Sequence, residues 1–140
     1  MLKNENSTDY RKLLTATKTI AMVGLSPKEE RPSNLVARYL IATGYQVIPV
    51  NPGQERILGL RCYAQLHDID QPVDMVDIFR KSETVFPLVR EAVEIGARSI
   101  WMQQGVVHQE AAAFARENGL VVVMDRCVKI EHMRLFPANG

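Results

Sequence analysis

Hydrophobic and polar residues alternate in blocks along the chain, and the blocks predict alternating strands and helices. Five short apolar runs are typical of buried strands, and they span residues 19–24, 46–50, 73–79, 99–103 and 120–124. Three of these runs are almost continuously apolar, as is typical of parallel strands covered on both faces. The run at 73–79 differs, because Asp74 and Asp77 interrupt it. We therefore expect that strand to lie nearer a sheet edge, or to have ends that reach water.

Segments with helical spacing separate the strands. After the first strand, apolar residues recur at helical spacing from Pro32 to Gly44, and a glycine there is suited to end a helix. After the third strand, a helix is expected to start at residues 83–84, because Pro87 is tolerated only in a first turn, and to end at Gly96.

The remaining helices are shorter. The segment HQEAAAFAREN predicts a helix over residues 108–118 that stops at Asn118-Gly119. Residues 51–72 hold only a short helical turn around residues 63–66. An opening helix is expected over residues 8–14, and a short closing helix after Cys127.

Strands that alternate with helices through right-handed crossovers form a parallel sheet with helices on both faces. The pattern thus predicts an α/β fold, a Rossmann-like three-layer sandwich with a five-stranded parallel sheet. The strand order 3-2-1-4-5 is our first expectation, and the flavodoxin-like order 2-1-3-4-5 is the alternative. In both, ligands bind at the carboxyl ends of the strands. The segments at those ends are residues 24–32, 51–52, 79–80, 103–105 and 125–127.

The composition fits one domain and narrows the classes of partner. Of the 140 residues, 46% are hydrophobic and 24% charged, which is typical of a globular protein. We expect a single domain over residues 1–140, with residues 1–18 as an amino-terminal extension that carries the opening helix. The formal net charge of +1 gives no general electrostatic reason to expect a nucleic acid or an anionic membrane as partner.

The signals for targeting and redox chemistry favour the cytoplasm. No apolar run approaches the roughly 20 residues of a membrane helix. The polar start MLKNENSTDYRK lacks the apolar core of a signal peptide. Cys62 and Cys127 are far apart and form no CxxC motif, so neither a disulfide framework nor a metal site is expected.

The loop after the first strand, GLSPKEERPSN, is the first candidate for ligand binding. Gly24 permits a tight turn and a close approach to a ligand, while Pro32 and Ser33 suit the start of a helix. The free N–H groups and the positive end of such a helix favour an anion such as phosphate, and Lys28 and Arg31 add charge. A capped surface loop with two solvated cations explains the same residues, and the spacing leaves both interpretations open.

A site of the NAD type fits this loop poorly. The GxGxxG fingerprint needs further glycines where Ser26 and Glu29 stand. The second strand ends in PVNPG, with no acid before Glu55 to hold the ribose hydroxyls. The P-loop pattern GxxxxGK[ST] is absent from the sequence.

Five blocks of the sequence together resemble one protein family. The blocks are GLSPKEERPSNLVARYL, GYQVIPVNPG, VDMVDIFRKSE, WMQQGV and VVVMDRCVKIEH. They are similar to the small stand-alone coenzyme A-binding proteins, which are related to the amino-terminal CoA-binding domain of succinyl-CoA synthetase α subunits and of NDP-forming acyl-CoA synthetases. The resemblance runs from about Thr19 to His132. It implies a Rossmann-like fold that binds CoA or acyl-CoA, with the diphosphate on the loop after the first strand.

The resemblance also implies which residues contact CoA. The candidates are Gly24, Leu25, Ser26, Arg31, Pro32, Ser33, Asn51, Pro52, Phe79, Arg80, Gln103 and Gly105. It implies the diphosphate for Gly24, Ser26 and Ser33, and the nucleotide cleft for Asn51 and Pro52. It implies the adenosine end for Phe79 and Arg80, and the pantetheine arm for Gln103 and Gly105. Phe79 equally suits core packing, and a surface ion pair with Glu83 is the alternative for Arg80.

One block departs from the family's pattern. Relatives often have WMQLGVxN where this chain has WMQQGVVH, so Gln104 replaces an apolar residue and His108 replaces an amide that caps a helix well. His108 is either a titrating group at the cleft or a weaker helix cap.

Catalytic groups are not recognisable in the sequence. The related synthetases use a phosphorylated histidine on a second domain, which the printed chain does not carry. His67, His108 and His132 show no nucleophile–base arrangement and no His–acid pair. Asp125 is expected to cap the closing turn. Cys127, on the ligand side, suits either a mixed disulfide with the CoA thiol or simple packing.

These observations lead us to expect a small binding module for CoA or acyl-CoA without catalytic residues. Two alternatives stay open. One is an enzyme or enzyme subunit that acts on acyl-CoA together with a protein partner. The other is a nucleotide-binding regulatory module without selectivity for CoA.

Overall fold

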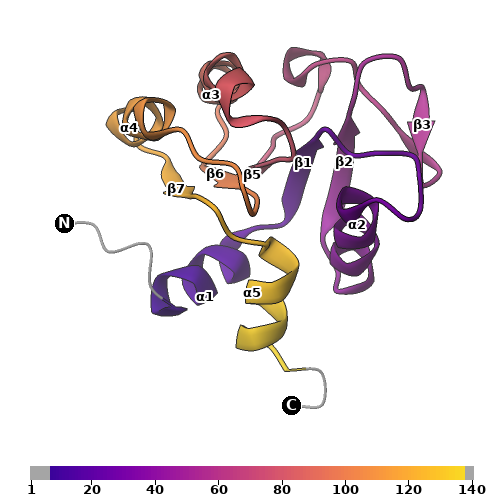
Figure 1. Cartoon of the computed structure of the whole chain (residues 1–140), viewed down its shortest axis with the longest axis horizontal. Helices are drawn as coiled ribbons and strands as arrows, with labels where there is room; N and C mark the ends of the chain where they lie inside the picture. Colours follow the sequence, from indigo (N-terminus) through magenta and orange to yellow (C-terminus); the bar gives the residue numbers. More distant parts are fainter. Residues whose placement is uncertain (1–6, 138–140) are drawn as a thin grey trace.

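A five-stranded parallel sheet forms the centre of the protein (Figure 1). The structure, a computed structural model, describes residues 7–137. In spatial order the strands are β2 (Gln46–Val50), β1 (Thr19–Val23), β5 (Met75–Ile78), β6 (Ser99–Met102) and β7 (Val121–Val123). All five predicted strands are confirmed, each within two residues of its expected bounds at either end. The α/β class and the parallel sheet are confirmed as well.

The strand order corrects our first expectation. Numbered along the chain, the five strands have the order 2-1-3-4-5, so the flavodoxin-like alternative is correct and 3-2-1-4-5 is wrong. The place beside β2 is already taken, because Tyr63 forms a parallel bridge with Val50. The Tyr63 N–H donates to the Pro49 carbonyl, and the Asn51 N–H donates to the Tyr63 carbonyl. The run at 73–79 therefore pairs with β1 instead of β2.

A small hairpin in the same connection was not predicted. Strands β3 (Arg56–Ile57) and β4 (Leu60–Arg61) pair antiparallel around a two-residue turn. Leu58 and Gly59, with φ of 57° and 74°, form that turn. Two-residue strands are too short to show a periodic pattern, and leucine gives no turn signal. The helical turn expected at residues 63–66 lies slightly later, as the 3₁₀ helix η1 (Leu66–Asp68).

All five predicted helices are present. They are α1 (Ser7–Ala16), α2 (Pro32–Ala42), α3 (Val85–Glu94), α4 (Gln109–Glu117) and α5 (Val128–Leu135). A 3₁₀ turn, η2 (Ser82–Thr84), leads into α3 and leaves Pro87 in its first turn, as expected. Within residues 7–137 the structure contains no helix that is long and apolar enough to cross a bilayer.

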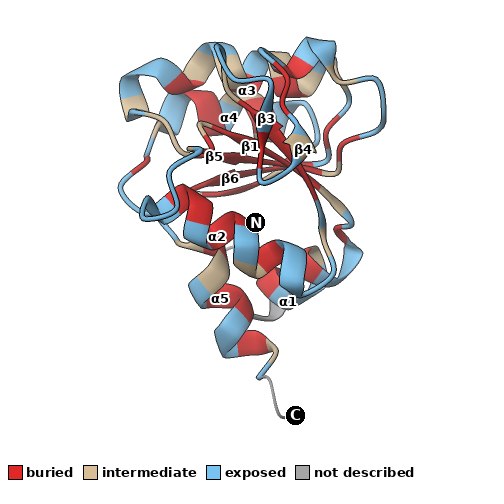
Figure 2. Ribbon diagram, turned by 90° about the vertical axis from the view of Figure 1, so that its right-hand side faces the viewer, coloured by how far each residue is buried: buried red, intermediate tan, exposed pale blue. Residues whose placement is uncertain are grey.

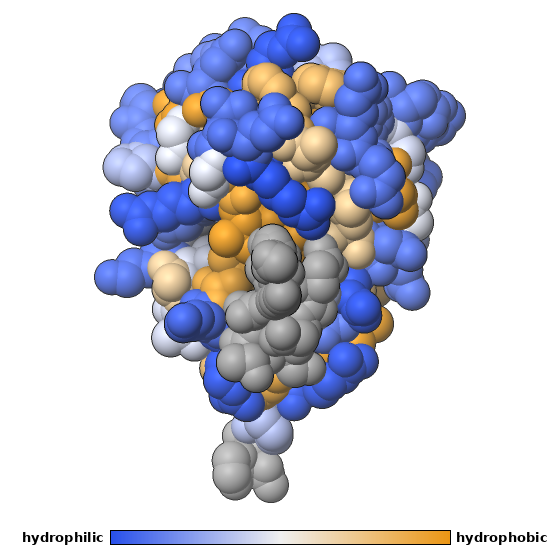
Figure 3. All heavy atoms as spheres, turned by 90° about the vertical axis from the view of Figure 1, so that its left-hand side faces the viewer, coloured by the Kyte–Doolittle hydropathy of each residue, from blue (hydrophilic) through white to orange (hydrophobic). Residues whose placement is uncertain are grey.

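Two helical layers cover the sheet (Figure 2). Helices α3 and α4 lie on one face, and α1, α2 and α5 lie on the other. Alternate strand residues face each layer, so that Val23 and Ile78 belong to the core under α3 and α4. Met22 and Trp101 belong to the core under α1, α2 and α5. The face on the left of Figure 1 is mostly hydrophilic, with apolar side chains gathered near its middle (Figure 3).

Strand β5 lies in the middle of the sheet, so the edge position expected from its two acids is wrong. Asp74 lies just before the strand and is partly exposed. Its carboxylate accepts hydrogen bonds from the Lys18 and Thr19 N–H groups at 2.8 and 3.1 Å. Asp77 is completely buried within the strand. The first acid thus ties the start of β1 to β5, and the second is a buried polar group that needs its own explanation.

Candidate functional site

The loop between β1 and α2 is held by side chains from its own helix and from β2. The Ser26 N–H donates to Ser33 Oγ at 2.9 Å, and Asn34 Nδ2 donates to the Ser26 carbonyl at 2.8 Å. Asn51, just after β2, donates from Nδ2 to the Leu25 carbonyl at 2.8 Å. These bonds fix the loop over the carboxyl ends of β1 and β2.

A second set of bonds holds the outer part of the loop. Arg38, one turn further along α2 than Asn34, donates from Nε to Asn34 Oδ1 at 2.9 Å. Its Nη2 donates to the Glu29 carbonyl at 2.8 Å. Sequence reasoning missed Asn34 and Arg38, because a helical position gives no sign that its side chain reaches back to a preceding loop.

Gly24 is required by the packing of the sheet itself. It adopts a φ of +89°, and its N–H donates to the Val50 carbonyl at 2.9 Å. A Cβ at this position would overlap the carbonyl oxygen of Phe79 at the end of β5. The turn therefore needs glycine so that the end of β1 can lie against the end of β5, in addition to any close approach to a ligand.

The amino end of α2 points into the region of the loop and has no side-chain cap. Arg31 occupies the N-cap position without a capping hydrogen bond, and Pro32 is the first helical residue. The hydroxyl of Ser33 is used by the Ser26 N–H. Arg31 and Lys28 are both exposed. The arrangement places a positive helix end and two cations at one place.

Two hollows flank this loop at the carboxyl edge of the sheet. The first, which we name the Arg80 hollow, lies on the α3 side and has a volume of about 330 Å³. Apolar residues of the strands and of α3 line it, together with Pro52 and Glu91. Among residues 7–137, Arg80 has no hydrogen-bond or ion-pair partner, so the ion pair with Glu83 is not formed.

The second hollow, which we name the Phe79 hollow, lies on the α2 side and has a volume of about 310 Å³. It is lined by Pro32, Val36, Phe79, Gln103, Gln104, Gly105 and Cys127. Asp125 holds one wall, because the Gly105 N–H donates to its Oδ1 at 2.8 Å. Asp125 therefore fixes the turn after β6, and the expectation that it caps the closing turn is wrong.

The structure separates two residues that the resemblance grouped together. Phe79 lines one hollow with Gln103 and Gly105, whereas Arg80 lines the other with Pro52. Consecutive residues at the end of a strand point to opposite faces of the sheet, so this separation follows from the extended backbone.

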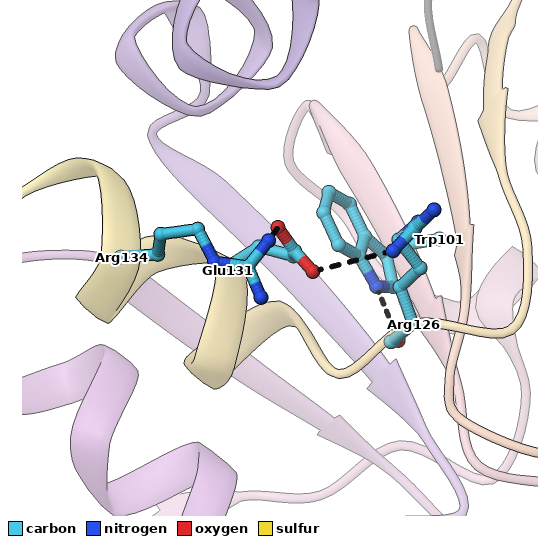
Figure 4. Close-up of polar contacts among 4 residues, drawn as sticks. All are labelled: Trp101, Arg126, Glu131 and Arg134. Atoms are coloured by element: carbon cyan, nitrogen blue, oxygen red, sulfur yellow. Dashed lines mark hydrogen bonds and ion pairs between the residues drawn. The ribbon is translucent and has the colours of Figure 1, made fainter. Parts of the chain in front are cut away.

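The segment that carries Cys127 is held in place by contacts of its neighbour Arg126 with Trp101 and Glu131 (Figure 4). Trp101 Nε1 donates to the Arg126 carbonyl at 2.8 Å. The Arg126 guanidinium lies 3.7 Å from buried Glu131, which also binds Arg134 at 3.1 Å. Arg126 thus forms an ion pair with Glu131. Cys127 lines the Phe79 hollow, whereas Arg126 is not among the residues that line it.

A buried polar pair lies beside the Phe79 hollow. Gln103 Nε2 donates to Asp77 Oδ1 at 2.9 Å, and both side chains are buried. Burial raises the pKa of Asp77 well above its usual value, although the hydrogen bond from Gln103 opposes the shift. Asp77 Oδ2 has no hydrogen-bond partner among the described residues. An acid within an otherwise apolar strand was the available signal, and it was interpreted as an edge strand or as a strand whose ends reach water.

The histidines of this region are engaged in contacts within the protein. His67 lies between Glu91 and Glu94, with ring nitrogens 3.0 and 2.9 Å from their carboxylates, so the expectation of no His–acid pair is wrong. Both ring nitrogens are occupied on a half-exposed surface, which leaves neither free to activate a nucleophile. His108 caps α4 by accepting from the Ala111 N–H at 3.0 Å, which confirms the helix-cap interpretation.

The third histidine lies away from the loop. His132 of α5 is buried beside Tyr39 and lines a hollow of about 530 Å³, with Lys18 and Gln46, at the opposite edge of the sheet. Among the described residues, no group of histidine, cysteine and acidic side chains has an arrangement that would hold a metal ion.

Comparison with known proteins agrees with this architecture. A family model described as "CoA binding domain" matches residues 18–133. An uncharacterized Bacillus subtilis protein, YneT, is 37% identical over 131 residues, with 94% of this chain and 97% of that protein covered. A hypothetical protein from Pyrococcus horikoshii superposes with a TM-score of 0.90 at 42% identity, covering 93% of this chain and 92% of that one.

A larger enzyme contains a similar segment. An ADP-forming acetate–CoA ligase from Archaeoglobus fulgidus is 30% identical over 83 residues, which are 58% of this chain but only 12% of the ligase. The match to the family model spans the sheet, helices α2 to α4, most of α5, and the two hollows beside the loop. The chain belongs to the CoA-binding domain family.

Proposed function

We propose that the protein binds CoA or acyl-CoA at the carboxyl edge of the sheet, as a cytoplasmic binding module without turnover of its own. The observation that carries the proposal is the arrangement of two hollows on either side of one loop. CoA is a long molecule with an anionic centre and two dissimilar arms. A positive loop between two hollows suits that shape.

The diphosphate is assigned to the loop between β1 and α2. Its negative charge is favoured by the amino end of α2, and Lys28 and Arg31 add positive charge at the surface. The bonds from Ser33, Asn34 and Asn51 hold the loop in place before a ligand arrives. A preformed loop loses less conformational entropy on binding.

The adenosine arm with its 3′-phosphate is assigned to the Arg80 hollow. Apolar walls from Val23, Val50 and Leu66 suit an adenine ring. Arg80 has no partner among the described residues, and its guanidinium is suited to bind a phosphate through two hydrogen bonds.

The pantetheine arm is assigned to the Phe79 hollow. Its lining is largely apolar, with Gln103 and Gln104 as polar groups, and Cys127 at its wall. This assignment moves Phe79 from the adenosine end to the pantetheine end.

A second candidate function rests on the acetate–CoA ligase match. A domain of this kind is part of that larger enzyme, so this chain is alternatively the CoA-binding component of an acyl-CoA enzyme that works with a protein partner.

Binding is tested by titration calorimetry with CoA, dephospho-CoA and NADH. We expect one site per chain for CoA and weaker binding of NADH, which lacks the 3′-phosphate and the pantetheine arm. Arg80→Ala should weaken CoA binding by about 1.5–3 kcal/mol, the range for hydrogen bonds to a charged group, and leave dephospho-CoA almost unchanged.

Arg98→Ala is the matched control, because Arg98 is exposed at the opposite edge of the sheet. Equal affinities for CoA and NADH would contradict the proposal in favour of a general nucleotide module. An equal loss of both CoA and dephospho-CoA in Arg80→Ala would remove the 3′-phosphate from the Arg80 hollow.

A further inference from the structure

The middle strand of the sheet carries an acid where an apolar residue would be expected. Asp77 has 0% exposure, and its neighbours in register are Met22 of β1 and Trp101 of β6. An unpaired carboxylate in such a place is very costly, so burial favours the neutral form of this acid. Replacement of this acid by a hydrophobic residue would avoid the cost, so the acid requires a reason.

The contact that Asp77 makes fixes the orientation of a neighbouring amide. Gln103 Nε2 donates to Asp77 Oδ1 at 2.9 Å, which directs the nitrogen of that amide into the protein. A primary amide has its oxygen on the other side of the same plane. Among the described residues, none donates to Gln103 Oε1.

Gln103, whose amide oxygen has no partner among the described residues, forms part of a cavity wall. Gln103 is 4% exposed, and it lines the Phe79 hollow. With its nitrogen bound to Asp77, the amide presents an acceptor and not a donor to that hollow. The buried Asp77 thereby determines which hydrogen-bonding group of Gln103 faces the hollow.

We propose that Asp77 is a positioning residue that turns Gln103 Oε1 into the Phe79 hollow, where it accepts a hydrogen bond from an amide N–H of the pantetheine arm. The inference rests on the proposed function and adds the group that reads this arm. Pantetheine has two secondary amides, each with one N–H donor. An acceptor held in a narrow apolar hollow selects such a donor over a chain of methylene groups.

The test compares two ligands on three single variants and one double variant. CoA has the pantetheine arm, whereas adenosine 3′,5′-bisphosphate has the adenosine end and no pantetheine. Asp77→Leu removes the acceptor that orients Gln103, and Asp77→Asn keeps an acceptor oxygen in its place. Gln103→Met removes the amide itself and keeps its length.

We expect Asp77→Leu and Gln103→Met each to weaken CoA binding by about tenfold, the upper range for one neutral hydrogen bond. Neither change should alter the affinity for the bisphosphate. Asp77→Asn should keep the wild-type affinity for both ligands. Because the two residues act as one unit, the double variant should lose no more than either single variant.

The outcomes separate this inference from the proposed function. If the wild type binds neither ligand, the proposed function is wrong. If CoA binds normally to Asp77→Leu and Gln103→Met, or if both ligands weaken equally in them, the positioning role is wrong and CoA binding stands.

A measurement on the wild type covers the case in which Asp77→Leu does not fold. The side-chain NH₂ of Gln103 should exchange slowly with deuterated water in the free protein. CoA, but not the bisphosphate, should shift the NMR signal of the Gln103 side-chain carbonyl carbon. A rapidly exchanging NH₂, or a carbonyl signal indifferent to CoA, would overturn the proposal.

Discussion

At the scale of single residues, the Asp77 carboxyl makes the stability of the fold depend on pH. Burial raises its pKa well above the ordinary value of 3.8, so the folded state binds a proton that the unfolded chain releases more easily. The contribution of the protonated Asp77 carboxyl to the free energy of unfolding is complete below the pKa that this group has in the unfolded chain. It is lost as the pH rises through the raised pKa of the folded state.

Asp77→Asn should remove this loss, because an amide keeps the hydrogen bond with Gln103 and has no proton to release. We expect the melting temperature of the variant to exceed that of the wild type at pH 8 by more than it does at pH 5. Thermal unfolding followed by circular dichroism at both pH values measures the difference. An identical difference at the two values would show that the buried acid does not titrate as described.

The sequence allowed the positions of the loop residues to be predicted, but not their partners. Gly24, Ser33 and Asn51 lie at strand ends that the alternation of elements already indicates. Asn34 and the partner of Asp77 were missed, because these bonds join residues whose proximity depends on the folded chain. The separation of Phe79 from Arg80 could have been predicted from strand geometry alone.

At the scale of elements, the turn between β1 and α2 depends on how closely β1 and β5 meet. Gly24 combines a positive φ with backbone contact to Phe79. Gly53, after β2, has almost the same φ of +88°, but a Cβ there would have no atom within 4 Å. The two glycines therefore allow the conformational cost to be separated from the packing cost.

Gly53→Ala should destabilise the fold by about 1–2 kcal/mol, the cost of a left-handed conformation for a residue with a Cβ. Gly24→Ala should destabilise it by clearly more, since the methyl group also displaces the end of β5. Urea unfolding of both variants measures the difference. Equal losses would mean that the Phe79 carbonyl moves aside without cost.

The elements that were predicted correctly are those with a periodic pattern. Helix α3, for example, has a periodic apolar face, and Pro87 lies in its first turn, where a proline is tolerated. The hairpin of β3 and β4 was missed because two residues show no period. The bridge between Tyr63 and Val50 that follows the hairpin occupies the free edge of β2, and no local pattern indicates it.

At the scale of the whole molecule, three helices meet at His132 on the edge of the sheet opposite the proposed CoA site. Tyr39 Oη of α2 lies 2.7 Å from His132 Nδ1, and the Phe136 ring lies 4.7 Å from the imidazole. Arg11 of α1 lies over Phe136. Burial lowers the pKa of His132 below its ordinary value of 6.5.

The lowered pKa of His132 should make this helical layer sensitive to acid. Its stabilising contribution is present above pH 6.5 and is lost as the pH falls through the lowered pKa of the folded state. We expect hydrogen exchange in α1 and α5 to accelerate between pH 7 and pH 5, after correction for the intrinsic rate. In His132→Phe this acceleration should be absent, whereas in His67→Gln, which changes a surface pair, it should remain.

The bridge between Tyr63 and Val50 also affects whether two copies of the protein can pair through their strand edges. Exposed strand edges are templates for pairing between chains, which leads to aggregation. Here the carboxyl end of β2 already pairs with Tyr63 through Val50, and at the other edge Arg116 donates to the Val122 carbonyl of β7 at 3.3 Å. Both borders of the sheet are thus partly occupied by the protein itself, so an incoming strand from another copy would first have to displace a native contact.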